Sequence, residues 1–155
     1  MSYKINFFHI ILYNIIYMYW KELKSYLLAF AIGTIIIVYL LDTGSIITEN
    51  KEIVHSYYHH LPNLLLDLFF VAAYLMVAYG FIKYFDIKKE VNKFITIIIT
   101  TIVITSLCCL YFKSKPVTTN FFSKWFNTVG YSSAIYDAIL VGFIYLIYTK
   151  IKKYF

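Results

Sequence analysis

Residues 94–112 read FITIIITTIVITSLCCLYF and contain no charged side chain. A helix needs about 20 consecutive apolar residues to cross the hydrocarbon core of a bilayer, so this stretch predicts a transmembrane helix. Three further apolar stretches of nearly this length occur at residues 23–41, 61–82 and 131–149. Because open strands would leave backbone groups unpaired in lipid, we expect an all-α polytopic membrane protein with four transmembrane helices.

The composition of the whole chain agrees with a membrane protein. Apolar residues make up 61% of the 155 residues and charged residues 14%, against roughly 45–50% and about 25% in soluble proteins. This leaves too little polar surface to cover a soluble particle. We therefore expect residues 1–155 to form a single integral membrane domain in contact with the lipid bilayer.

The N-terminal segment, residues 1–20, has a different pattern. Its polar side chains fall on one side of a helical wheel and its apolar side chains fall largely opposite. This pattern predicts an amphipathic helix that lies in the membrane interface and ends in Tyr19 and Trp20 at headgroup level. The alternative is a fifth span. A signal peptide is not favoured, because no small-residue cleavage site follows the apolar stretch.

All basic residues are lysines, and their distribution predicts the orientation. Ten of them lie in the N-terminal region, in the link between the second and third spans, or in the C-terminal tail: Lys4, Lys21, Lys24, Lys83, Lys88, Lys89, Lys93, Lys150, Lys152 and Lys153. The two opposite loops hold Lys51, Lys113, Lys115 and Lys124. The positive-inside rule then places both termini in the cytoplasm. Because these lysines flank apolar runs, we expect them to meet lipid phosphates and predict no nucleic-acid binding.

The two halves of the chain resemble each other. Residues 21–26 (KELKSY) are similar to residues 89–94 (KEVNKF), and each segment opens an apolar span. Each of these spans is followed by a loop and then by a second span with an early aspartate, Asp67 or Asp137. This pattern predicts two repeated hairpins related by an axis along the membrane normal.

Asp67 and Asp137 are the leading candidates for an ion or proton site. A carboxylate inside a span costs roughly 2.5–3.5 kcal/mol at the helix centre and marks a functional site by default. Paired by the repeat, the two carboxylates could share a proton or hold a cation. Tyr74 and Tyr145, about two turns inward, could extend this polar path. The alternative is that a Tyr or Thr hydroxyl caps each aspartate separately near the membrane surface.

Two further patterns suggest ion binding. His55 and His59 share a helical face, and Glu52 could supply the third ligand that a Zn or Cu site needs. The neighbouring tyrosines instead favour an aromatic belt before a span, and we predict no cofactor. Residues 128–131 (TVGY) match most of the potassium-filter signature, but Ser132 stands where a filter has glycine.

Small residues recur every four positions in two spans, and this spacing lets helix backbones approach closely. They are Ala29 and Gly33 in the first span, and Ala134, Ala138 and Gly142 in the fourth. We predict that they pack helices and join the chain to a second copy or to other membrane proteins. Neither a nucleotide-binding loop nor a hydrolase arrangement is present in the sequence.

Residues 120–137 (NFFSKWFNTVGYSSAIYD) and 62–67 (PNLLLD) resemble poorly characterised multi-span membrane proteins of large nucleocytoplasmic DNA viruses. The shared pattern is Trp125, then a Val-Gly pair, then Ala-x-Tyr-Asp opening the last span. The resemblance implies a component of a virion or virus-factory membrane and names no catalytic residue.

These observations predict a non-enzymatic membrane protein with a structural or scaffolding role. The first alternative is a small ion or proton channel or transporter that uses Asp67 and Asp137. The second is an accessory subunit of a larger complex or of a membrane enzyme.

Overall fold

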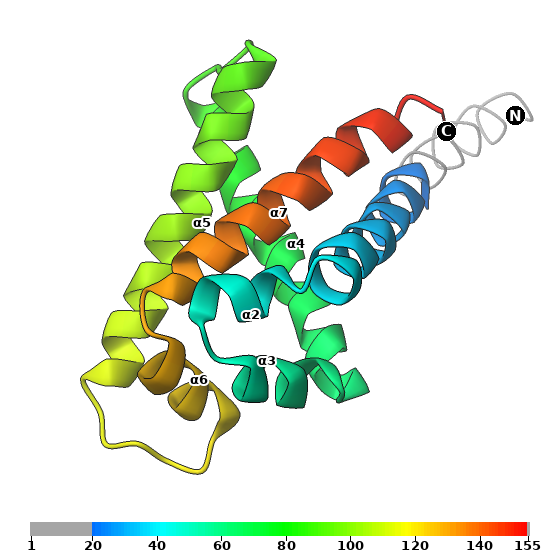
Figure 1. Ribbon diagram of the computed structural model, residues 1–155. Coiled ribbons are helices and arrows are strands. Elements are labelled where there is room, and N and C mark those ends of the chain that lie inside the picture. Colours follow the sequence, from blue (N-terminus) through cyan, green and yellow to red (C-terminus); the bar gives the residue numbers. More distant parts are fainter. Residues whose placement is uncertain (1–19, 155) are drawn as a thin grey trace, which may run out of the picture.

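Four long helices form the body of the structure, a computed structural model that describes residues 20–154. They are the first helix, Trp20–Leu40, followed by α4 (Leu61–Tyr84), α5 (Glu90–Lys113) and α7 (Ser132–Ile151). Each is long and apolar enough to cross a membrane (Figure 1). The prediction of an all-α chain with four apolar helices is confirmed. The predicted interfacial helix and the alternative fifth span fall on residues 1–19, outside the described residues.

The ends of the long helices follow from local sequence. Pro62 occupies the first turn of α4, where a missing backbone N–H removes no intrahelical hydrogen bond. Lys83, Lys113 and Lys150 lie in the last turns of α4, α5 and α7. A positive charge at a helix C-terminus is favourable because the helix dipole is negative there. The last six residues of the first helix, Ile35–Leu40, widen into a π-helix.

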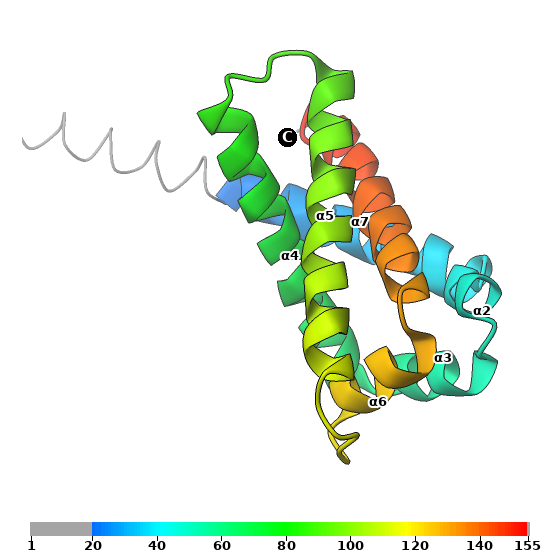
Figure 2. The same ribbon diagram turned by 90° about the vertical axis from the view of Figure 1, so that its left-hand side faces the viewer.

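Short helices occupy the loop between the first helix and α4 and the loop between α5 and α7. They are α2 (Thr43–Thr48), α3 (Lys51–Tyr58) and α6 (Phe121–Val129). Asparagine starts two of them: Asn50 Oδ1 accepts a hydrogen bond from the Ile53 N–H at 3.2 Å, and Asn120 Oδ1 accepts one from the Phe122 N–H at 2.9 Å. Such caps satisfy donors that have no partner inside the helix. Helices α3 and α6 lie together across one end of the long helices (Figure 2).

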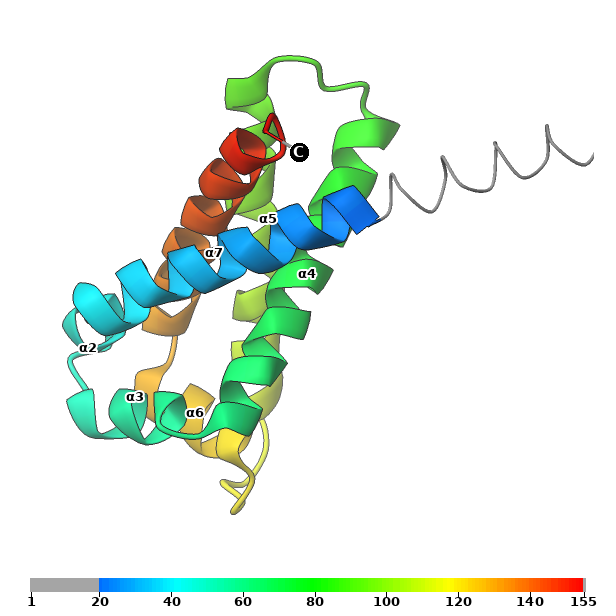
Figure 3. The same ribbon diagram turned by 90° about the vertical axis from the view of Figure 1, so that its right-hand side faces the viewer.

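The long helices pack in two layers. Helix α5 lies beside α4 and α7, and the first helix runs obliquely across α4 and α7 (Figure 3). The Tyr26 hydroxyl donates to the carbonyl oxygen of Leu68 in α4. A Cβ added at Gly33 would lie 2.6 Å from Cγ1 of Ile144 in α7. The first helix therefore touches α7 with almost no side-chain volume between the two backbones.

The predicted small-residue faces are buried within the chain. Ala29 has no exposed surface, and Ala134 and Ala138 are almost fully buried. A Cβ added at Gly142 would lie 2.6 Å from Cδ1 of Ile98 in α5. Gly33 and Gly142 thus bring the first helix, α7 and α5 together inside one molecule.

The outward faces of the long helices carry large apolar side chains. Phe69 and Met76 of α4, Ile99 and Leu107 of α5, and Leu28 of the first helix are all exposed. Such continuous apolar surface is unusual on a soluble protein and suits contact with lipid.

The helix order separates the lysines into two groups. The link between α4 and α5 and the end of α7 lie at one end of the molecule, and the start of the first helix, which crosses α4 obliquely, lies in the half nearer to that end (Figures 1 and 3). Glu22 and Lys152 form an ion pair at that end. Helices α3 and α6 lie at the other end. This alternation is the one that an even number of spans requires. Its assignment to the cytoplasm stays a prediction, as does the repeat, since the first hairpin carries α2 and α3 in its loop and the second carries α6.

The topology predicts which single cysteines an impermeant thiol reagent reaches in sealed cells. In a background with both natural cysteines replaced by alanine, cysteines at the exposed positions Lys51 and Lys115 should label from outside. Cysteines at the exposed positions Lys88 and Lys153 should label only after permeabilisation. Equal labelling of both pairs in intact cells would contradict this topology.

Candidate functional site

A cavity of about 400 Å³ lies where α4, α5 and α7 meet the short helices α3 and α6. Asp67 of α4 and Asp137 of α7 both line it. They are the only charged side chains among the lining residues that the structure describes. Most of the remaining wall is aromatic: Tyr57, Tyr58, Phe70, Tyr74, Phe112, Phe121, Phe122, Trp125, Phe126 and Tyr136. The cavity is therefore an apolar chamber with two carboxylates.

Helix α6 forms one wall of the cavity, and the chain reverses sharply after it. Gly130 ends α6 with φ 63° and ψ −140°, a conformation that favours glycine. The turn leaves Trp125 and Phe126 buried. The side-chain amide of Asn127 donates to the carbonyl oxygen of Phe112 at 3.4 Å. This contact ties α6 to the end of α5.

Helix α3 closes the cavity from the side of α4, through aromatic contacts. The Tyr57 ring stacks on Phe121 with centroids 4.5 Å apart and lies 5.6 Å from the Trp125 ring. The hydroxyls of Tyr58 and Tyr136 form a hydrogen bond. Burial raises the pKa of Tyr58 well above its usual range, and the nearby Asp67 carboxylate adds to the effect. The hydroxyl therefore keeps its proton, and the contact joins α3 to α7 as a neutral pair.

Asp67 is held by a tyrosine from the preceding helix. The Tyr57 hydroxyl donates to Oδ1 of Asp67 at 2.6 Å and also lies 3.2 Å from the carbonyl oxygen of Asn63. Burial, followed by the charge of Asp67, raises the pKa of Tyr57 far above its usual range. Tyr57 is thus a permanent donor to this carboxylate.

Asp137 is held by two hydroxyls from other helices. Thr105 Oγ1 of α5 lies 2.8 Å from Oδ2 of Asp137, and the Tyr74 hydroxyl of α4 lies 3.3 Å from the same atom. The two hydroxyl oxygens are 3.0 Å apart. When both hydroxyls donate to Asp137, each has used its one hydrogen and neither donates to the other.

The structure brings three of the four predicted ion-site residues together. Asp67, Asp137 and Tyr74 line the same cavity, and Tyr74 bonds to the aspartate of the other hairpin. Tyr145 does not line it. Its ring lies 6.3 Å from that of Tyr79 and 6.4 Å from that of Phe94, further along the helices.

The sequence alternative named the kind of group that holds each aspartate, a Tyr or Thr hydroxyl, but it did not name Tyr57 or Thr105. The position of Tyr57 suggested an aromatic belt before the second span, and Thr105 lies in a predicted span that was noted for its lack of charge. Nothing in the spacing of Tyr57 and Asp67 predicts their contact, because it depends on how α3 folds back.

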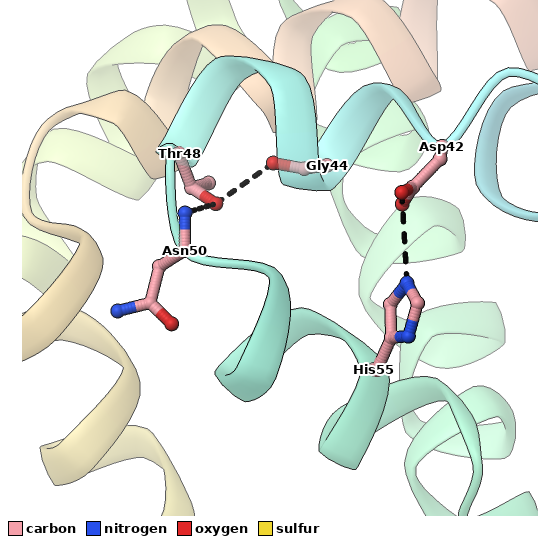
Figure 4. A network of polar contacts seen from close by, with 5 residues as sticks. All are labelled: Asp42, Gly44, Thr48, Asn50 and His55. Carbon is pink, nitrogen blue, oxygen red and sulfur yellow. Dashed lines mark hydrogen bonds and ion pairs between the residues drawn. The ribbon is translucent and has the colours of Figure 1, made fainter.

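The predicted metal ligands are not gathered into a site. Within residues 20–154, no group of three or more His, Cys, Asp and Glu side chains could hold a metal ion. His55 Nε2 instead lies 3.5 Å from Oδ2 of Asp42 (Figure 4), and its ring is 6.0 Å from that of His59. Glu52 is exposed. The contact of His55 with Asp42 joins α3 to the end of the first helix.

The segment that resembles a potassium filter is not one. Thr128 and Val129 belong to α6, and the N–H of Gly130 donates to the carbonyl oxygen of Phe126. A filter needs successive carbonyls that face an ion. Helical carbonyls point along the helix axis, which agrees with the argument from Ser132 against a filter.

No family model, curated protein or solved structure matches this chain.

Proposed function

We propose that the protein is a small membrane transporter that binds a proton or a cation at Asp67 and Asp137. The observation that carries this proposal is the shared cavity, which both carboxylates line without any cationic side chain. Three of the four helices that are long and apolar enough to span a membrane, α4, α5 and α7, line it. A carboxylate in such a place is a default candidate for an ion or proton pathway.

The charges of the described residues leave both aspartates without a counter-ion. The ion pairs that involve lysine are Lys88 with Asp86, Lys93 with Glu90, and Lys152 with Glu22. All of them lie at the end away from the cavity. An unpaired carboxylate in a medium of low dielectric constant is costly. A proton or a cation taken from solution would remove that cost.

The core beside the cavity favours a transporter over an open pore. Leu75, Ala78, Ile97 and Ile144 are buried and fill the centre of the bundle between the cavity and its opposite end. Thr101, a buried polar side chain beside them, donates its hydroxyl to the carbonyl oxygen of Ile97 and is thus satisfied within its own helix. Passage to the far side then requires the helices to rearrange, as in alternating access.

The structural or scaffolding role has less to support it. The sequence supported this role through the small-residue faces, which were predicted to contact a second copy or other membrane proteins. In the structure these faces contact other helices of the same chain. A second copy would have to use other surfaces. The roles as a scaffold, as an accessory subunit and as a viral membrane component stay predictions.

Ion flux into proteoliposomes tests the proposal. Vesicles that contain the wild-type protein and an internal pH dye should change their internal pH faster than empty vesicles when a proton gradient is imposed, or when a Na⁺ or K⁺ gradient drives exchange for protons. The double variant Asp67→Asn/Asp137→Asn should behave like empty vesicles. Asp86→Asn is the matched control, because Asp86 is an exposed carboxylate in the α4–α5 link. Folded wild-type protein that gives no flux above empty vesicles would overturn the proposal.

A further inference from the structure

We propose that the natural occupant of the cavity is a small organic cation, with an ammonium group at the aspartates and an apolar body against the aromatic wall. The inference rests on the proposed function for the location of the site, and it adds the chemical class of the substrate. The size, the wall and the charge of the cavity each support it.

The size of the cavity exceeds what a bare ion needs. Its volume is about 400 Å³, and pockets for small organic ligands are typically about 300–1,000 Å³. A hard metal cation prefers about six or more oxygen ligands. The described part of the chain offers no cluster of three or more ligating side chains here, so the chamber fits a larger ligand with fewer polar contacts.

The wall offers rings that no cationic side chain covers. Phe112 stacks on Phe126 with centroids 5.4 Å apart, and Phe70 meets Phe122 edge to face at 5.6 Å. The lysines that lie over aromatic rings in the described chain cover Tyr131, Tyr111 and Tyr148. None of these three rings lines the cavity. No described lysine therefore competes with a bound cation for the ring faces that this stacking leaves open toward the cavity.

The polar groups gather at two points of an otherwise apolar wall. Asp67 has one hydroxyl donor, Tyr57, and Asp137 has two, Tyr74 and Thr105. A singly charged ammonium neutralises one carboxylate. When that carboxylate is protonated beforehand, binding of the ammonium releases its proton to solution. The expected coupling is one cation against one proton.

Equilibrium binding of radiolabelled benzyltrimethylammonium to purified protein is the direct test. Wild type and Asp86→Asn should bind it saturably. The double variant Asp67→Asn/Asp137→Asn should lose the binding. Neopentylbenzene has the same shape without the charge, and it should not compete. Absence of saturable binding to folded wild type, or equal binding by the double variant, would overturn the inference.

A natural cysteine reports where the probe binds. Cys108 lines the cavity, whereas Cys109 does not and is fully buried. In Cys109→Ala, Cys108 is the single thiol, and benzyltrimethylammonium at about ten times its Kd should slow labelling of Cys108 by methanethiosulfonate about tenfold. Unchanged labelling of Cys108 with the probe bound would place the probe elsewhere and contradict the inference.

The two proposals fail in different ways. Binding of the probe and protection of Cys108, without any flux, would support the organic-cation site and contradict the proposal of transport. Flux of protons or Na⁺ without binding of benzyltrimethylammonium would support the proposal of transport and contradict the organic-cation site.

Discussion

Asp137→Asn is expected to lower the flux to less than about one tenth of the wild-type rate, which corresponds to about 1.4 kcal/mol or more in the barrier. Asparagine keeps the size of the side chain and still accepts hydrogen bonds from Thr105 and Tyr74. It cannot gain or lose the charge. The variant thus removes the proton- or cation-binding group and leaves the packing of α4, α5 and α7 nearly intact. Flux of the reconstituted variant, divided by the protein content of the vesicles, is the measurement.

Two controls separate charge from packing at this site. Thr105→Val removes one hydroxyl donor to Asp137 but retains the carboxylate, so some flux should remain. Asp86→Asn removes an exposed carboxylate whose pair with Lys88 contributes little, and its flux should equal that of wild type. If Asp137→Asn transported like wild type, the carboxylate of α7 would have no part in the mechanism.

Gly33→Leu is expected to cause a large loss of stability, of about 1–3 kcal/mol or more in the free energy of unfolding, because it overpacks a filled contact. Even the Cβ atom would stand 2.6 Å from Cγ1 of Ile144 and 3.6 Å from its Cα. The first helix would have to move away from α7. Unfolding in mixed detergent and denaturing surfactant, followed by circular dichroism, measures the change.

Gly80→Leu is the matched control for this prediction. Gly80 also lies inside a long helix, but a Cβ there meets no heavy atom within 4 Å. Replacing it should leave the stability unchanged or slightly raised, since glycine inside a helix costs roughly 0.5–1 kcal/mol relative to alanine. Equal stability of the two variants would contradict the close approach of the first helix to α7.

Much of the fold could be predicted because it depends on local composition. The span predicted at 61–82 is α4, Leu61–Tyr84, and the span predicted at 94–112 is α5, Glu90–Lys113. Apolar length requires burial in lipid or protein whatever the neighbours are, and a helix satisfies its own backbone. Helix α2 was not predicted, and α3 was suggested only by the helical spacing of His55 and His59, since helices this short depend on caps and packing more than on periodicity.

The sequence by itself determined that this is a helical chain with four apolar spans and two carboxylates inside them, because hydropathy and residue type are properties of single segments. Only the tertiary structure decided which groups meet. Asp137 of α7 accepts hydrogen bonds from Thr105 of α5 and Tyr74 of α4, and Asp67 accepts one from Tyr57. Such contacts depend on helix rotation and on the folding back of α3 and α6, which no local pattern specifies. The small residues show the same division: their spacing predicts a close helix contact, but only the packed chain makes Ile144 of the same molecule the partner of Gly33.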